Sequence, residues 1–143
     1  MAAPAKLLLF ELTEAIIGVF FDVYNELGPG FQEFVFARAM AIALPKAGIP
    51  VNQEVPLTVW FRGAPLVTFR ADLVVPTGPL LIEVKAASSI EPFHIAQTLG
   101  YLKATEIEVA LLLNFGRRPQ FKRLVFENAR KSALHGGGQL EEC

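Results

Sequence analysis

The sequence contains very little cysteine and histidine. Of 143 residues, one is cysteine (Cys143) and two are histidine (His94 and His135). A single cysteine cannot form an internal disulfide, so we expect a reducing, cytoplasmic location. Zinc sites are built mostly from grouped cysteines and histidines, so these scattered residues argue against a zinc protein. His135 and Cys143 fall in a Gly-rich stretch, residues 133–143, which we expect to be a loose tail.

Long apolar runs and a strong net charge are also missing. Apolar runs such as residues 109–113 are far shorter than the roughly 18–20 residues of a membrane-spanning helix. The first residues make a poor signal peptide, because Glu11 and Glu14 interrupt the apolar stretch. The net charge of −1 argues mildly against tight, non-specific binding to nucleic acid, which usually requires a basic surface.

Basic residues nevertheless gather late in the chain. They are Arg117, Arg118, Lys122, Arg123, Arg130 and Lys131. A solvated face is the favoured interpretation, and a patch that contacts phosphates is the alternative. Trp60 and the twelve phenylalanines are interpreted as core or interface residues rather than as a platform for base stacking.

Apolar residues are abundant. They make up 52% of the chain, whereas charged residues make up only 19%, which is low for a soluble domain of this size. A chain of 143 residues suits one domain with a sizeable core. The excess of apolar residues also predicts surface that a partner or a second copy covers, so a homo-oligomer is possible.

Hydrophobic periodicity predicts an α/β fold with a mixed sheet flanked by helices. Helices are predicted over residues 11–27, over 31–44 with Pro45 and Gly48 ending the helix, and from Pro92 onward. Strands are predicted over 54–61, 66–75, 80–87, 108–115 and 121–126. Pro56 places the first strand at an edge or a bulge, and the apolar run 108–115 predicts a strand buried on both faces.

Three charged residues interrupt the apolar stretch "FRADLVVPTGPLLIEVKAA". Glu83 and Lys85 are two apart on one predicted strand and so share a face, and the turn brings Asp72 near them. Two close carboxylates repel unless a cation lies between them, and Mg²⁺ or Mn²⁺ prefers such oxygen ligands. With a lysine beside them, the three residues outline a metal-dependent phosphodiesterase. A cross-strand salt bridge on a solvated face is the alternative, which the apolar neighbours disfavour.

The pattern D-x10-E-x-K resembles that of the PD-(D/E)XK nuclease superfamily, although "RAD" replaces its usual "PD". Within it, the chain is similar to the bacterial GxxExxY proteins. "GFQEFVF" matches their name motif with Phe36 in place of tyrosine, and "NELGPGF", "ADLVV", "IEVKA", "YLKAT" and "LLLNFG" also resemble that family. The resemblance covers about residues 11–126 and implies a restriction-endonuclease-like core. The implied partner is DNA or RNA and the implied cofactor is Mg²⁺ or Mn²⁺.

The resemblance also implies roles for individual residues. The implied metal ligands are Glu33, Asp72, Glu83 and the backbone carbonyl of Val84, the implied catalytic lysine is Lys85, and Gln97 and Tyr101 form the supporting Q-x3-Y element. From the residues alone, the favoured interpretation of Glu33 is a first-turn glutamate stabilised by the helix dipole. Gln97 and Tyr101 could be helix surface and a buried aromatic, and His94 is interpreted as a helix-start or packing residue.

Three functions remain open on the sequence. The first is a metal-dependent nuclease, with Asp72, Glu83 and Lys85 as its catalytic residues. The alternative is a catalytically weak or inactive nuclease-fold module that binds nucleic acid or a protein. The third is an assembly protein whose apolar surface builds an oligomer.

Overall fold

The computed structural model describes residues 5–131, and their side chains from Leu9 onward. The predicted loose tail at 133–143, with His135 and Cys143, lies outside the described residues. The elements are α1 (Ala5–Leu27), α2 (Glu33–Lys46), β1 (Asn52–Phe61), β2 (Ala64–Val75), β3 (Leu80–Lys85), α3 (Pro92–Lys103), β4 (Val109–Phe115), β5 (Pro119–Val125) and a 3₁₀ turn, η1 (Asn128–Arg130). The predicted order of helix, helix, three strands, helix, strand and strand is confirmed.

The five strands form one mixed sheet in the spatial order β1-β2-β3-β4-β5. Only β3 and β4 pair in parallel, and α3 connects them, as a parallel pair requires a crossover. The other neighbours are antiparallel and joined by short turns. Two predictions about the sheet are confirmed: β1, which contains Pro56, lies at an edge, and every residue of β4 is buried.

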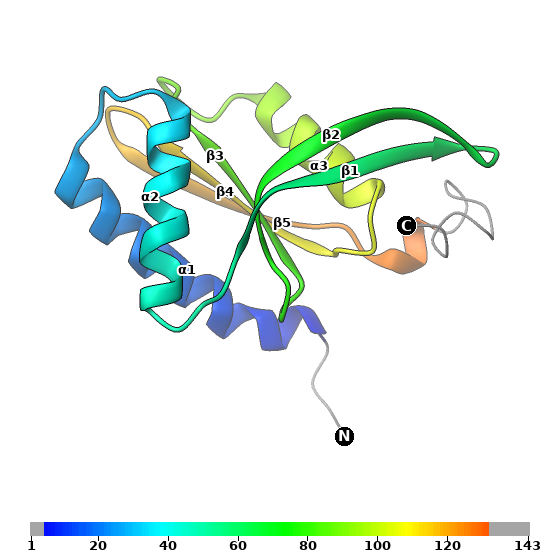
Figure 1. Cartoon of the computed structure of the whole chain (residues 1–143), viewed down its shortest axis with the longest axis horizontal. Helices are drawn as coiled ribbons and strands as arrows, with labels where there is room; N and C mark the ends of the chain where they lie inside the picture. The colour runs from blue at the N-terminus through cyan, green and yellow to red at the C-terminus, as the bar shows by residue number, and fades with distance from the viewer. Residues whose placement is uncertain (1–4, 132–143) are drawn as a thin grey trace.

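Helices cover both faces of the sheet (Figure 1). Phe20 of α1 and Met40 of α2 pack with Ile82 in one apolar cluster. Leu102 of α3 packs with Leu81 in a second cluster. Because consecutive strand residues point to opposite faces, Leu81 and Ile82 assign the two clusters to opposite sides of the sheet. Between residues 5 and 131, no helix combines the length and hydropathy needed to cross a membrane.

The end of α2 differs from the prediction. The helix passes through Pro45 to Lys46, so the predicted end at residue 44 is wrong. A proline in the last turn removes only its own N–H, and the N–H groups of Ala47 and Gly48 still close that turn, on Leu44 O at 3.0 Å and Pro45 O at 2.9 Å. Gly48, with φ of 86°, then ends the helix as predicted.

The strand β3 ends at Lys85, two residues before the predicted end. Beyond it, both backbone groups of Ala87 bond to the side chain of Asn114 instead of to another strand: Ala87 N–H donates to Asn114 Oδ1 at 2.9 Å, and Asn114 Nδ2 donates to Ala87 O at 3.0 Å. The side chain of Asn114 therefore replaces a strand partner at this point.

The strands β1 and β2 form a long hairpin, the arm (residues 52–75), that leaves the sheet. β2 pairs with β3 only at residues 73–75. Before that, the arm runs past α3, away from α1 and α2 (Figure 1). Every residue from 61 to 70 is exposed, so most of the outer arm lies on the surface.

One interpretation of residue types needs correction. Of the late basic residues, Arg117, Arg118, Lys122 and Arg130 are exposed, as a solvated face predicts. Lys131 is buried instead, and its Nζ donates to the carbonyls of Thr105 and Ile107. For the phenylalanines the predicted interface role stays a prediction, since seven of the twelve are exposed and so lie outside the core: Phe10, Phe31, Phe34, Phe61, Phe69, Phe93 and Phe121.

Candidate active site

The pairing of β2 with β3 ends where the two acidic residues face each other. Leu73 pairs with Ile82, and the next positions along the register are Asp72 and Glu83. Here side chains replace the backbone ladder. The N–H of Asp72 donates to Glu83 Oε1 at 2.9 Å, and the N–H of Val84 donates to Asp72 Oδ2 at 2.8 Å. This reciprocal pair of bonds, the carboxylate fork, holds both carboxylates at the point where the strands separate.

The carboxylate fork concentrates negative charge in a poorly hydrated place. Only 3% of Glu83 is exposed, and Asp72 is half-buried. Burial, followed by the charge of Asp72, raises the pKa of Glu83 to about 8. Burial also raises the pKa of Asp72, against the lowering effect of its bond from Val84. Without a cation the pair therefore retains a proton into the neutral range.

The helix α3 supplies the neighbours of Lys85. Lys85 Nζ donates to Gln97 Oε1 at 2.9 Å, which links β3 to α3. Tyr101 follows one turn later on the same helical face and is 6% exposed. Burial raises the pKa of Tyr101, and the charges of Glu83 and Asp72 add to this effect. The structure thus brings the Q-x3-Y element beside the carboxylate fork.

The remaining implied ligands lie at different distances from this centre. Val84 is in the carboxylate fork itself, between Glu83 and Lys85. Glu33 is the first residue of α2 and is exposed, and its charge raises the pKa of both Asp72 and Glu83. Among residues 5–131, however, no three Asp, Glu, His or Cys residues are gathered as a ready metal-binding group. Glu33 is therefore an electrostatic neighbour of the fork and is not gathered with it.

The carboxylate fork fits a hard divalent cation by its donor chemistry. Each hydrogen bond of the fork uses one carboxylate oxygen, Glu83 Oε1 or Asp72 Oδ2. The second oxygen of each group is outside these bonds. Carboxylate oxygens are the ligands that Mg²⁺ prefers, and a cation here would offset the repulsion that raises both pKa values.

His94 has a local structural role. Its Nδ1 accepts a hydrogen bond from the N–H of Glu91 at 2.9 Å, at the start of α3. The side chain is 5% exposed and satisfies a backbone donor that the helix itself cannot pair. Its interpretation as a helix-start residue is confirmed.

Asn114 and Gly116 are site-supporting residues that the sequence reasoning missed. Asn114 is fully buried and holds Ala87, two residues after Lys85. A Cβ on Gly116 would lie 2.2 Å from Ala87 O, so only glycine permits this close approach. A signal was available for Asn114, because a polar residue within the apolar run "LLLNF" requires buried hydrogen-bond partners.

Glu54 of β1 is a second missed neighbour. Its flanking residues Gln53 and Val55 pair with Leu73 and Ala71, so Glu54 lies opposite Asp72. Its φ of 49° is unusual for a residue other than glycine within a strand, and its charge raises the pKa of Asp72. Nothing in the sequence pattern distinguishes this glutamate from other surface glutamates.

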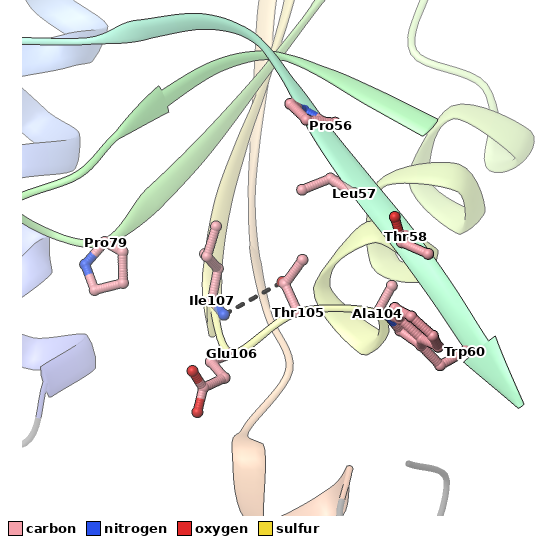
Figure 2. A pocket seen from close by; sticks show the side chains of 9 residues that line it. All are labelled: Pro56, Leu57, Thr58, Trp60, Pro79, Ala104, Thr105, Glu106 and Ile107. Atoms are coloured by element: carbon pink, nitrogen blue, oxygen red, sulfur yellow. Dashed lines mark hydrogen bonds between the residues drawn. The ribbon is translucent and has the colours of Figure 1, made fainter. Parts of the chain in front are cut away.

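Two cavities flank the arm. One, of about 460 Å³, lies between the arm and α3 and includes Gln97 and Tyr101 in its lining. The other, of about 480 Å³, lies between β1 and the turn that follows α3, and Figure 2 shows its lining side chains, among them Trp60 and Ala104. Trp60 and Ala104 line both cavities, but only the first shares residues with the surroundings of the carboxylate fork.

Comparison with known proteins identifies a family model and a structural neighbour. A model of the PD-(D/E)XK nuclease superfamily matches residues 10–124, a range that includes the fork, Lys85 and the Q-x3-Y element. The structure is similar to the crystal structure of SSO0001, with a TM-score of 0.51 and 18% identity over 91% of this chain and 66% of that one. The chain thus spans just under two thirds of SSO0001, and at this identity the likeness supports the fold alone. No curated protein matches the chain significantly.

Proposed function

Because the chain belongs to the PD-(D/E)XK nuclease superfamily, we propose that it is a Mg²⁺- or Mn²⁺-dependent nuclease that hydrolyses phosphodiester bonds in DNA or RNA. One observation carries the proposal. In the carboxylate fork, Asp72 and Glu83 face each other, and Glu83 lies two residues before Lys85, whose Nζ donates to Gln97 Oε1. Within the superfamily we assign the chain to the GxxExxY group, with Phe36 at the tyrosine position. Phe36 is fully buried, and its ring stacks on that of Phe115 with 4.4 Å between the ring centroids, so Phe36 is a core residue.

Each residue of the carboxylate fork has a role in this proposal. Asp72 and Glu83 would hold the metal through the oxygens that the fork bonds do not use, with the Val84 carbonyl as a further ligand. The family resemblance assigns Glu33 to the set as well, and a bound cation would offset the repulsion between its exposed carboxylate and the two acids of the fork. When bound, the metal activates a water and offsets the negative charge of the scissile phosphate.

Lys85 and its neighbours act on the reacting groups. The amine of Lys85 either positions the attacking water or stabilises charge on a phosphate oxygen. The bond to Gln97 Oε1 restricts the flexible lysine side chain to one direction, which lowers the entropy lost on reaching the reactive geometry. Tyr101, which is mostly buried, supports the site from α3, because the charges of Glu83 and Asp72 both act on its hydroxyl.

The test is cleavage of DNA and RNA, as single strands and as duplexes, in the presence of Mn²⁺. Replacement of Lys85 by alanine should lower the cleavage rate by about 10²-fold or more, because a charge that acts in the transition state is lost. The matched control is Lys122→Ala, which removes an exposed lysine of β5. If wild type and Lys85→Ala give the same rates on every substrate, the catalytic role is wrong.

A binding module that retains the fold without cutting is the second candidate. Two observations favour it: the net charge of −1, and the absence of Glu33 from any three-residue acidic group in residues 5–131. This candidate predicts that nucleic acid binds and stays intact with Mn²⁺ present, so the same cleavage assay separates the two functions.

A further inference from the structure

The cavity of about 460 Å³ between the arm and α3, the arm cavity, has the composition of a ligand site. Its volume lies in the range of small-molecule sites, roughly 300–1,000 Å³. Aromatic side chains from both elements line it: Trp60, Phe61 and Phe69 from the arm, and Tyr101 from α3. Phe61 is 51% exposed and Phe69 is 40% exposed, so large apolar groups face the opening rather than the core.

The arm cavity adjoins the carboxylate fork. Gln97, which accepts the hydrogen bond from Lys85, lines the cavity. Tyr101 lines it as well, and the charges of Glu83 and Asp72 reach this side chain strongly enough to raise its pKa. A group bound in the arm cavity would therefore lie beside a phosphate positioned at the fork.

Trp60, Gln97, Tyr101 and Lys103 line the arm cavity and each carries a hydrogen-bond donor, and the hydroxyl of Tyr101 can also accept. Trp60 Nε1 is buried and has no hydrogen-bond partner within residues 5–131. The bond from Lys85 occupies Gln97 Oε1, and it leaves the amide Nε2 of Gln97 outside this contact. A ligand with flat apolar faces and hydrogen-bond acceptors on its edge would match both the aromatic rings and these donors.

We propose that the arm cavity binds one unpaired base of the nucleic-acid strand, next to the phosphate that is cut. The proposal rests on the nuclease function and specifies its substrate as a strand with at least one unstacked base. A base has two π-faces for Phe69 and its aromatic neighbours, and acceptors on its edge for the amide of Gln97. Within a duplex both faces are covered by neighbouring bases, so a fully paired base cannot enter.

The experiment uses Trp60 as its reporter, because it is the single tryptophan of the chain. Full-length Lys85→Ala with Mn²⁺ is titrated with a dye-labelled single strand of DNA, the same sequence as RNA, an abasic strand of equal length, and a blunt-ended duplex of the same DNA sequence. We expect the single strands of DNA, RNA or both to change the Trp60 emission, and the abasic strand and duplex to leave it unchanged. Dye anisotropy measures binding independently of the emission.

Two variants of the arm separate stacking from folding. Phe69→Leu keeps an apolar side chain against Tyr101, whose ring lies 5.4 Å from that of Phe69, but removes the stacking surface. It should raise the Kd of the single strand at least about fivefold, the effect of losing one base–aromatic contact. Val67→Ala is the matched control, because Val67 is 43% exposed on the same arm and does not line the cavity.

The outcomes distinguish this inference from the nuclease function. Strand binding with unchanged Trp60 emission, or equal emission changes with the abasic strand or the duplex, overturns the base site alone. A second copy of the chain could occupy the cavity instead. In that case Trp60 emission would change with protein concentration in the absence of any oligonucleotide, and light scattering would detect dimers. This result also overturns the base site. If no strand binds and wild type cuts nothing, both the nuclease function and the base site are wrong.

Discussion

At the scale of single residues, the carboxylate fork explains how two acids are tolerated in an apolar setting. Each carboxylate accepts a backbone N–H that would otherwise lack a strand partner, Asp72 from Val84 and Glu83 from Asp72. A buried acid without such a donor would carry a much larger desolvation penalty. The raised pKa of Glu83, about 8, indicates that part of this penalty remains and that a cation would remove it.

The pKa of Glu83 predicts how the metal-free protein responds to pH. The ordinary value is 4.5 and the folded value is about 8, so the folded state holds one proton more than the unfolded state between these limits. Stability therefore falls as pH rises from about 4.5 through about 8. Glu83→Gln keeps an Oε1 acceptor and cannot ionise, so above pH 8 it should be more stable than wild type, by an amount on the order of 1–4 kcal/mol.

The measurement is urea unfolding from pH 4.5 to pH 9 with a chelator present, for wild type and Glu83→Gln. The two stabilities should converge at the acid end and separate as pH rises. Parallel pH profiles for the two proteins would contradict the raised pKa of Glu83.

At the scale of elements, the segment that follows β3 is held from β4. Asn114 forms both hydrogen bonds to Ala87, and Gly116 leaves space for the carbonyl of that residue. The chain on one side of Lys85 is therefore fixed by the carboxylate fork and on the other side by Asn114. This arrangement limits the motion of the lysine backbone.

Replacing Asn114 by leucine tests this support. The change removes two hydrogen bonds and leaves the N–H and carbonyl of Ala87 without partners, which should cost about 2–4 kcal/mol of stability. Cleavage by the protein that remains folded should also fall, because the backbone after Lys85 loses its support. Urea unfolding and a Mn²⁺ cleavage assay measure the two effects.

The control for that variant is Leu111→Ala, a fully buried change on the same strand. It should lower stability by about 2–5 kcal/mol through a cavity, without touching Ala87. If the two variants lose equal stability and neither loses activity per folded molecule, Asn114 supports only the fold.

The arm explains at the element scale why so much apolar surface is exposed. β2 loses β3 as a neighbour before residue 73, so the outer arm is a two-stranded ribbon that α3 covers on part of one face. Phe61, Leu66, Val67 and Phe69 are each at least 40% exposed on it. Such a patch is typical of a binding surface.

At the scale of the whole molecule, the low charge of the sequence has a structural explanation. Two apolar clusters fill both faces of one sheet, and the surplus apolar residues lie on the arm, on the three helices and on β5. Homo-oligomer formation and the cytoplasmic location remain predictions. Most of the late basic residues are exposed to solvent, whereas Lys131 is buried. Its Nζ donates to the carbonyls of Thr105 and Ile107, which bonds the end of the described chain to the turn after α3.

Metal binding should stabilise the entire fold, because the carboxylate fork connects β2, in the arm, to β3, at the centre of the sheet. We expect Mn²⁺ to raise the Tm of wild type, and to raise it more at pH 8 than at pH 6, since a proton must leave Glu83. With Mn²⁺ at about 100 times its Kd, the added stability is about 2.7 kcal/mol.

Calorimetric titration measures Mn²⁺ binding, and thermal unfolding of the same preparation measures the rise in Tm. Asp72→Ala, which removes one carboxylate of the fork, should abolish both the binding heat and the Tm shift. An equal Tm shift in Asp72→Ala would place the metal elsewhere on the molecule.

The sequence by itself determined the order of elements, the mixed sheet and the closeness of Asp72, Glu83 and Lys85. These follow from local rules, since apolar periodicity and short turns set the strands and two-residue alternation sets the faces. The ends of the elements were less predictable. The helix α2 continues through Pro45, and β3 ends at Lys85 because Ala87 bonds to the side chain of Asn114 instead of to a strand backbone.

Only the tertiary structure decided how the site is held and what surrounds it. The carboxylate fork, the Lys85–Gln97 bond, the support by Asn114 and the position of Glu54 all join residues that are distant in sequence. The same holds for Trp60, which the sequence assigned to a core or an interface and which the fold places at a cavity beside the fork. No local pattern names the partners in these contacts, because the partners are set by the packing of the strands and of α3.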